Sequence, residues 1–78
     1  MVTRDLTERI TFNPRQCGGR PCIRGMRVRV SDILDMLAGG ATREDIRRDF
    51  PCIEDDDITA SLQYADREAV RRVVIAAE

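Results

Sequence analysis

The chain has 78 residues, of which 35% are charged and 42% hydrophobic, and its formal net charge is −1. This length limits it to a single domain, 1–78, whose small core contributes roughly 3–5 kcal/mol, so chains of this size commonly rely on disulfides, a metal or a second subunit. The sequence has no histidine, the usual catalytic proton carrier and a common zinc ligand. We therefore expect no catalytic residues, no metal and no cofactor, and we expect a homodimer.

The three cysteines, Cys17, Cys22 and Cys52, are an odd number, and no apolar run follows the first residues. This pattern predicts reduced thiols, a cytoplasmic location and no membrane segment. Cys17 and Cys22 have a spacing compatible with a metal site, but structural zinc takes four ligands. A carboxylate or a second chain would have to complete the set, so we interpret the thiols as ordinary small side chains.

Charge is distributed unevenly along the chain, and all 13 basic residues are arginines. Residues 1–30 have a net charge of +5, residues 31–57 a net charge of −6, and residues 58–78 a net charge of zero. Guanidinium groups form two-pronged hydrogen bonds with phosphates and carboxylates. The basic front and the acidic middle predict two surfaces for different partners, or one self-complementary surface of a dimer.

The front of the chain is predicted to form a β-ribbon over 9–30, preceded by a disordered segment over 1–8. A first short strand covers 9–12. A second covers 26–30, where apolar and charged residues alternate with the period of a half-buried strand. Its inward side chains are Met26, Val28 and Val30, and its outward side chains are Arg27 and Arg29.

Three helices are predicted over 31–77, which gives a mostly α (α+β) domain with a helix-turn-helix bundle behind the ribbon. Ser31 is placed to cap the first helix, 32–38, and the two glycines that follow can end it. Thr42 and Asp45 have the spacing of a capping box for the second helix.

The third helix is predicted to begin at Glu54 or Asp55 and to run as far as Ala77, a length of roughly 30 Å. This length exceeds the small core beneath it, so the distal part needs another surface to cover its apolar side chains. That surface could belong to a second copy or to a groove of another protein. The predicted partner-binding residues are Val70, Arg71, Val73 and Val74.

Arginines of the ribbon and of the second helix are the candidates for binding DNA phosphates. In a helix-turn-helix protein the start of the recognition helix meets the bases. Here the residues at 54–57 are all acidic, which opposes DNA binding and favours capping of the helix or an acidic face for a basic partner. The predicted DNA-binding residues are Arg20, Arg24, Arg27, Arg29, Arg43, Arg47 and Arg48.

The pattern Gly-x-Pro-x-Ile-x-Gly-x-Arg is formed by Gly19, Pro21, Ile23, Gly25 and Arg27. It is accompanied by Asn13-Pro14, Leu37-Ala38-Gly39-Gly40, Phe50-Pro51 and Asp57-Ile58. Together these motifs resemble the family known as domain of unknown function 433, and the resemblance extends from Ile10 to Ala65. The chain departs from the family at Met26, where threonine is usual, and at Glu54, where a serine or threonine cap is usual.

This resemblance implies a prokaryotic, homeodomain-like helix-turn-helix protein of the antitoxin type. Such a protein would bind and silence a cognate toxin resembling PIN-type ribonucleases, and as a dimer it would repress its own promoter DNA. Two alternatives remain open from the sequence. The chain could be a stand-alone DNA-binding regulator, or a structural or adaptor dimer that does not bind DNA.

Overall fold

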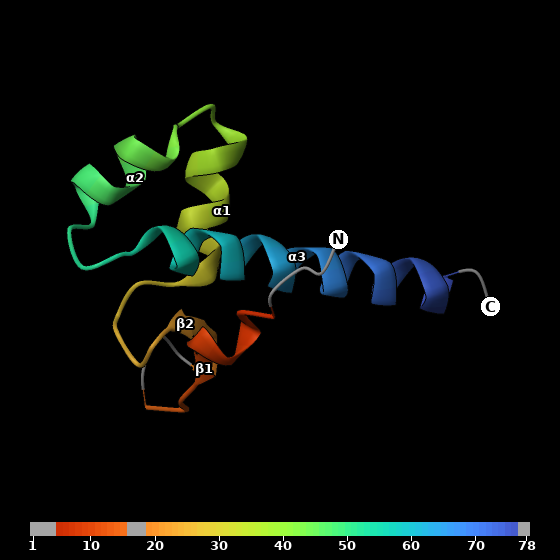
Figure 1. Ribbon diagram of the computed structural model, residues 1–78. Helices are drawn as coiled ribbons and strands as arrows, with labels where there is room; N and C mark the ends of the chain where they lie inside the picture. Colours follow the sequence, from red (N-terminus) through yellow and green to blue (C-terminus); the bar gives the residue numbers. More distant parts are fainter. Residues whose placement is uncertain (1–4, 16–18, 77–78) are drawn as a thin grey trace.

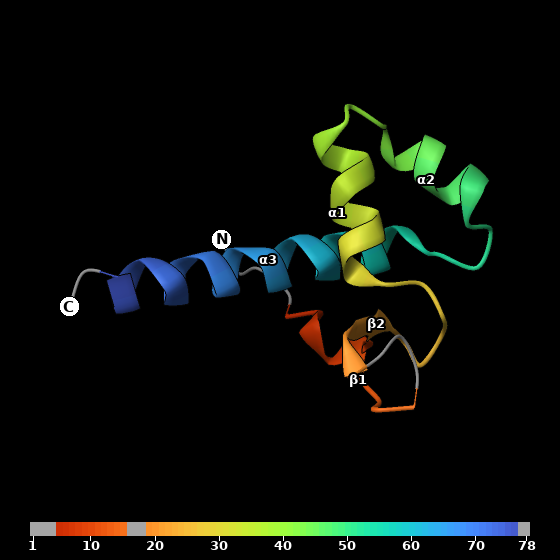
Figure 2. The ribbon, with the colours of Figure 1, turned by 180° about the vertical axis from the view of Figure 1, so that it is seen from behind.

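The computed structural model describes residues 5–15 and 19–76, with side chains described as far as Ala69. In chain order the elements are η1 (Thr7–Arg9), β1 (Ile10–Phe12), β2 (Pro21–Ile23), α1 (Val30–Ala38), α2 (Arg43–Asp49) and α3 (Asp55–Ala76). Figures 1 and 2 show α1 and α2 on one side of α3 and the strands on the other, while the second half of α3 extends beyond both. The predicted α+β fold, a short antiparallel pair followed by three helices, is confirmed.

The strand predicted over 26–30 is wrong, because β2 lies earlier and pairs with β1 in the register Ile10 to Ile23. A tight turn at Arg24 and Gly25 reverses the chain directly after β2, so residues 26–27 lie in a bend. Only residues 28–29 of the predicted strand pair with β2. Arg29 forms an isolated bridge with Cys22, and Ile23 N–H donates to the Val28 carbonyl at 2.9 Å. The alternation nevertheless gave the correct faces, since Val28 and Val30 are buried and Arg27 is exposed.

Disorder over 1–8 is also wrong for the part that the structure describes, and residues 1–4 lie outside it. Leu6 is only 7% exposed, and its N–H donates to the Gln63 side chain at 2.8 Å. Asp5 accepts hydrogen bonds from the N–H and hydroxyl of Thr7. The apolar Leu6 thus holds the N-terminal segment against α3, and burying one leucine contributes about 1.5–3 kcal/mol.

The core lies where the three helices meet the hairpin. Ile33 of α1, Ile46 of α2 and Ile58 of α3 are fully buried, and Ile23 brings β2 into the same cluster. Ile53, just before α3, and Ile58, within it, are both buried at the positions of a hydrophobic staple. Within the described residues, no buried side-chain nitrogen or oxygen lacks a hydrogen-bond partner.

The helix ends follow mostly local signals. The capping box of α2 is confirmed: Asp45 N–H donates to Thr42 Oγ1 at 3.1 Å, and Thr42 N–H donates to the Asp45 carboxylate at 3.0 Å. Gly40 ends α1 with a φ of +95°, the left-handed conformation that glycine adopts without strain. The predicted Ser31 cap is wrong, because α1 starts at Val30, two residues earlier than predicted, and Ser31 lies inside the helix. The Asp32 side chain instead accepts the N–H of Arg29 at 3.4 Å.

Candidate functional site

The first turn of α3 holds a buried carboxylate, Asp57, whose side chain is 0% exposed. Arg9, from the end of η1, donates to its Oδ1 at 2.9 Å. Arg24, from the turn after β2, donates to Oδ1 from Nε at 3.0 Å and to Oδ2 from Nη2 at 2.9 Å. The N–H of Glu54 donates to Oδ2 at 2.8 Å. Asp57 therefore caps α3 and also joins the hairpin to the helix bundle.

The backbone around Arg24 positions its guanidinium for this contact. Arg24 and Gly25 both have positive φ, 46° and 71°, and Met26 N–H donates to Ile23 O at 2.7 Å. Two consecutive left-handed residues closed by this bond form a type I′ turn, which matches the twist of a hairpin. Glycine takes such a φ freely, whereas arginine adopts it at a cost. The Asp57 contact and a further bond to Cys52 O at 2.9 Å hold Arg24 there.

The electrostatics of this cluster favour the charged forms. Burial opposes the charge on Asp57, but hydrogen bonds from Arg24, from the Glu54 N–H and from Arg9 outweigh it and lower the pKa of the carboxyl group. Hydrogen bonding to Asp57 correspondingly raises the pKa of Arg24. All three groups therefore remain ionised at neutral pH, and the cluster has no proton to give or take there.

A third arginine closes the other side of the same helical turn. Arg43, at the start of α2, donates from Nη1 to the Asp55 carboxylate at 3.1 Å and to the Thr59 hydroxyl at 3.0 Å. Arg9 also bonds the Glu54 carboxylate at 2.8 Å and lies 3.7 Å from that of Asp56. Each of the four acids at 54–57 thus has an arginine of the chain itself within ion-pair distance.

Four of the seven predicted DNA-binding arginines form ion pairs within the chain. Arg24 and Arg43 are held by the acids of α3, and Arg29 lies 3.6 Å from Asp32. Arg48 lies 3.5 Å from Asp45 along its own helix. Of the seven candidates, those that are exposed and make no ion pair within the described residues are Arg20, Arg27 and Arg47.

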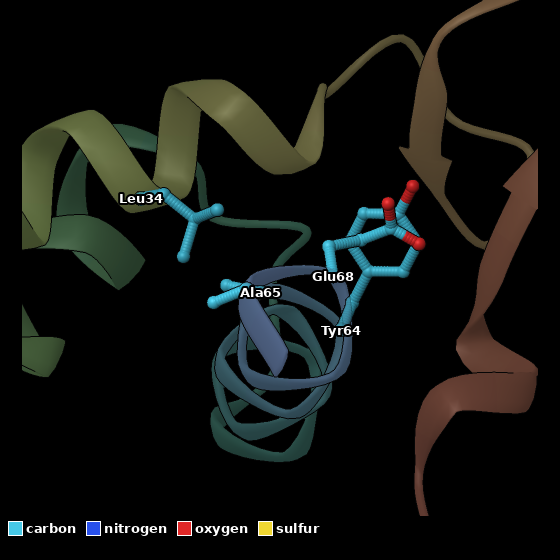
Figure 3. A pocket seen from close by; sticks show the side chains of 5 residues that line it. Leu34, Tyr64, Ala65 and Glu68 are labelled. Carbon is cyan, nitrogen blue, oxygen red and sulfur yellow. The ribbon is translucent and has the colours of Figure 1, made fainter. Parts of the chain in front are cut away.

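A groove that the sequence did not reveal opens on α3 about two to three turns after the cluster. It has a volume of about 490 Å³ and is lined by Leu34, Tyr64, Ala65, Glu68 and Ala69. In Figure 3, Leu34 reaches from α1 toward Ala65, while Tyr64 and Glu68 lie on the other side of α3, toward the strands. The two alanines form a floor of small side chains, and helical spacing alone would assign the same residues to a core-facing stripe.

An exposed aromatic side chain borders this groove. Phe12, at the end of β1, is 62% exposed and contacts Tyr64 with the ring centroids 6.1 Å apart. The groove and this ring together form an apolar surface that joins elements from both ends of the chain. We call it the groove surface, defined by Phe12, Leu34, Tyr64, Ala65, Glu68 and Ala69.

The remaining predicted residues are placed only in part. The side chains of Val70, Arg71, Val73 and Val74 lie outside the described side chains, although α3 continues as a helix to Ala76. Cys22 is buried and Cys52 exposed, and neither forms a disulfide within the described residues. Among the described residues, no three histidine, cysteine or acidic side chains are grouped to hold a metal, and no helix has the length and hydropathy to span a membrane.

Comparison with known proteins agrees with the motifs described above. The family model described as "Protein of unknown function (DUF433)" matches residues 10–65. The crystal structure of a DUF433 member protein from Anabaena variabilis ATCC 29413 is similar with a TM-score of 0.74 and 23% sequence identity, over 90% of this chain and 69% of that one. At this identity the likeness concerns the fold alone. No curated protein matches the chain. The chain belongs to the DUF433 family.

Proposed function

We propose that this chain is an antitoxin-like binding module that works as a dimer and neutralises a nuclease-like toxin protein by binding it. One observation carries the proposal: the first turn of α3 is closed by the chain's own arginines, whereas the groove surface beside it is open. The chain thus offers an apolar, partly aromatic surface to a protein partner. Its sequence also contains no histidine for acid–base catalysis.

The first turn of α3, whose acids are paired with arginines of the chain itself, argues against recognition of DNA bases by α3. A recognition helix inserts its N-terminal residues between phosphate backbones to reach base edges. Here the first turn carries Asp55, Asp56 and Asp57, and carboxylates near phosphates are repelled. The arginines that compensate them approach from the hairpin and from α2, so they are committed to these acids and are not directed at a ligand.

The open groove surface supports a protein partner. The cores of protein interfaces are enriched in aromatic side chains and poor in charges, and binding energy concentrates in a few such residues. Phe12 and Tyr64 provide two adjacent rings, and of the described residues that line the groove one is charged, Glu68. The helical extension of α3 continues directly from this surface and lengthens the face available to a partner (Figure 1).

The experiment is co-expression of the chain with the protein encoded beside its gene, followed by size-exclusion chromatography with light scattering. We expect the two proteins to elute together, and we expect the chain to relieve growth arrest caused by its neighbour. Separate elution and no relief of growth arrest would refute the antitoxin-like function. The mass of the chain alone tests the homodimer in the same measurement.

DNA binding remains a second candidate because Arg20, Arg27 and Arg47 are exposed and make no ion pair within the described residues. A gel shift with the chain's own promoter fragment tests it. Binding should weaken steeply with salt and fall when Arg27 and Arg47 are replaced by alanine. The matched control is Arg48→Ala, which removes an exposed arginine that already pairs with Asp45 along its own helix. If neither protein nor promoter binds, the adaptor dimer is the remaining interpretation.

A further inference from the structure

We infer that the groove surface receives a basic amphipathic helix of the partner protein, with an apolar side chain seated on Ala65 and Ala69 and an arginine or lysine directed at Glu68. This inference rests on the proposed function and specifies the chemistry of the partner. It joins two features of one site: a groove floored by small residues, and the Glu68 carboxylate, which is the charged group among the described residues that line it.

The shape of the groove favours a helix as the occupant. Its floor is a stretch of α3, and its walls are side chains of α1 and of α3 itself, with Leu34 on one side and Tyr64 on the other (Figure 3). Interaxial distances between packed helices are about 8–10 Å depending on the contact side chains, and alanines on the floor favour a close approach. An incoming helix would insert apolar side chains at i, i+3 and i+4 spacing, as in other helix-in-groove complexes.

The charge of the groove favours a basic partner. Glu68 is half-buried, and it makes no hydrogen bond or ion pair within the described residues. Covering its carboxylate with an apolar or acidic partner would remove water without a replacement, which is costly. A cation on the partner would replace the lost hydration with a charge-assisted hydrogen bond.

The aromatic edge adds an anchor next to this charge. The Phe12 ring is exposed on the side that faces solvent, and the Tyr64 ring supports it from α3. An arginine that reaches Glu68 would pass close to these rings, where a guanidinium can also stack on an aromatic face. Apolar contact and charge pairing are thus available within one helix-sized site.

The test compares two charge reversals on the same helix in the full chain, using the co-expressed neighbour protein as the probe. Glu68→Arg places a cation in the groove. Asp66→Arg makes the same change two residues away at an exposed position that does not line the groove. Both positions are solvent-accessible on an intact helix, and circular dichroism with thermal melting checks that both variants fold.

We expect Glu68→Arg to weaken binding of the neighbour at least about tenfold and Asp66→Arg to change it less than about threefold. Replacing the partner's facing cation by glutamate should restore binding to Glu68→Arg. If both variants bind as tightly as the wild type, the inference is wrong while the proposed function stands. If the wild type does not bind the neighbour, the proposed function is wrong and the inference with it. If Glu68→Arg alone abolishes self-association of the isolated chain, the occupant is a second copy and the inference is overturned.

Discussion

Replacement of Asp57 by asparagine tests whether the buried carboxylate joins the hairpin to the bundle. Asparagine has nearly the same shape and can still accept the Glu54 N–H, but it leaves two guanidinium groups without their shared anion. Removing one partner of a buried ion pair costs about 3–5 kcal/mol. The Arg9 and Arg24 side chains are 24% and 37% exposed, so they regain part of their hydration and the cost falls to about 2–3 kcal/mol.

A loss of that size is large for a domain of this length, whose total stability is on the order of 4–12 kcal/mol. The melting temperature should fall by roughly 10–20 °C. Urea unfolding followed by circular dichroism measures the free-energy change directly. The matched control is Asp56→Asn, at a side chain that is 39% exposed and 3.7 Å from Arg9, where we expect less than about 1 kcal/mol. Equal destabilisation by the two variants, or a loss below about 1 kcal/mol at Asp57, would show that the buried pair does not hold the hairpin in place.

Three further changes test the fold. The pKa of Asp57 is lowered in the folded state. The contribution of the ionised carboxylate to the free energy of unfolding is therefore fully present above the unfolded pKa of about 3.9, and it is lost as the pH falls through the lower folded-state pKa. Below about pH 4, the stability of Asp57→Asn, measured in urea titrations, should therefore depend less on pH than that of the wild type. Thr42→Ala removes the α2 cap and should cost about 1 kcal/mol in urea unfolding, whereas Thr42→Ser should retain most of it. Gly25→Ala should cost about 1–2 kcal/mol through its φ of +71° alone, because no atom lies within 4 Å of the added Cβ; an unchanged melting temperature would show that the turn relaxes.

The parts of the fold that the sequence predicted are those with short-range causes. The box of Thr42 and Asp45 and the glycine end at Gly40 depend on residues three or fewer positions apart, so spacing alone identifies them. The hydrophobic staple of Ile53 and Ile58 is local in the same way. In each case the helix backbone fixes the distance between the partners before any tertiary contact forms.

The misplaced strand has a specific cause. Alternation over 26–30 identified the buried face correctly, but a period of two does not distinguish a strand from a turn that leads into a helix. The decisive residues were Arg24 and Gly25, which form the type I′ turn. Such turns usually carry asparagine or aspartate before glycine, so the arginine concealed the turn. Arginine is tolerated there because Asp57 binds its guanidinium from α3.

The buried cluster itself could not be predicted, because its partners are separated by 48 residues for Arg9 and by 33 for Arg24. By residue type alone, Asp57 does not differ from Asp55 and Asp56. The available signal was its position three residues after Glu54, which makes it the residue that reaches back to the helix cap. The groove surface could not be predicted for a related reason, since Phe12 and Tyr64 are far apart in the sequence and come into contact only in the folded chain.

These contacts change the meaning of the charge asymmetry. The basic front and the acidic middle suggested two surfaces for different partners, yet Arg9 and Arg24 of the front are paired with acids of the middle inside the molecule. Arg43, though within the acidic middle, is directed at the same helical turn. An incoming phosphate or carboxylate would have to break one of these existing pairs to bind the arginine. Among the described residues the groove surface is open and mostly apolar, with the Glu68 carboxylate in its lining, and this supports the proposed protein partner over a polyanion.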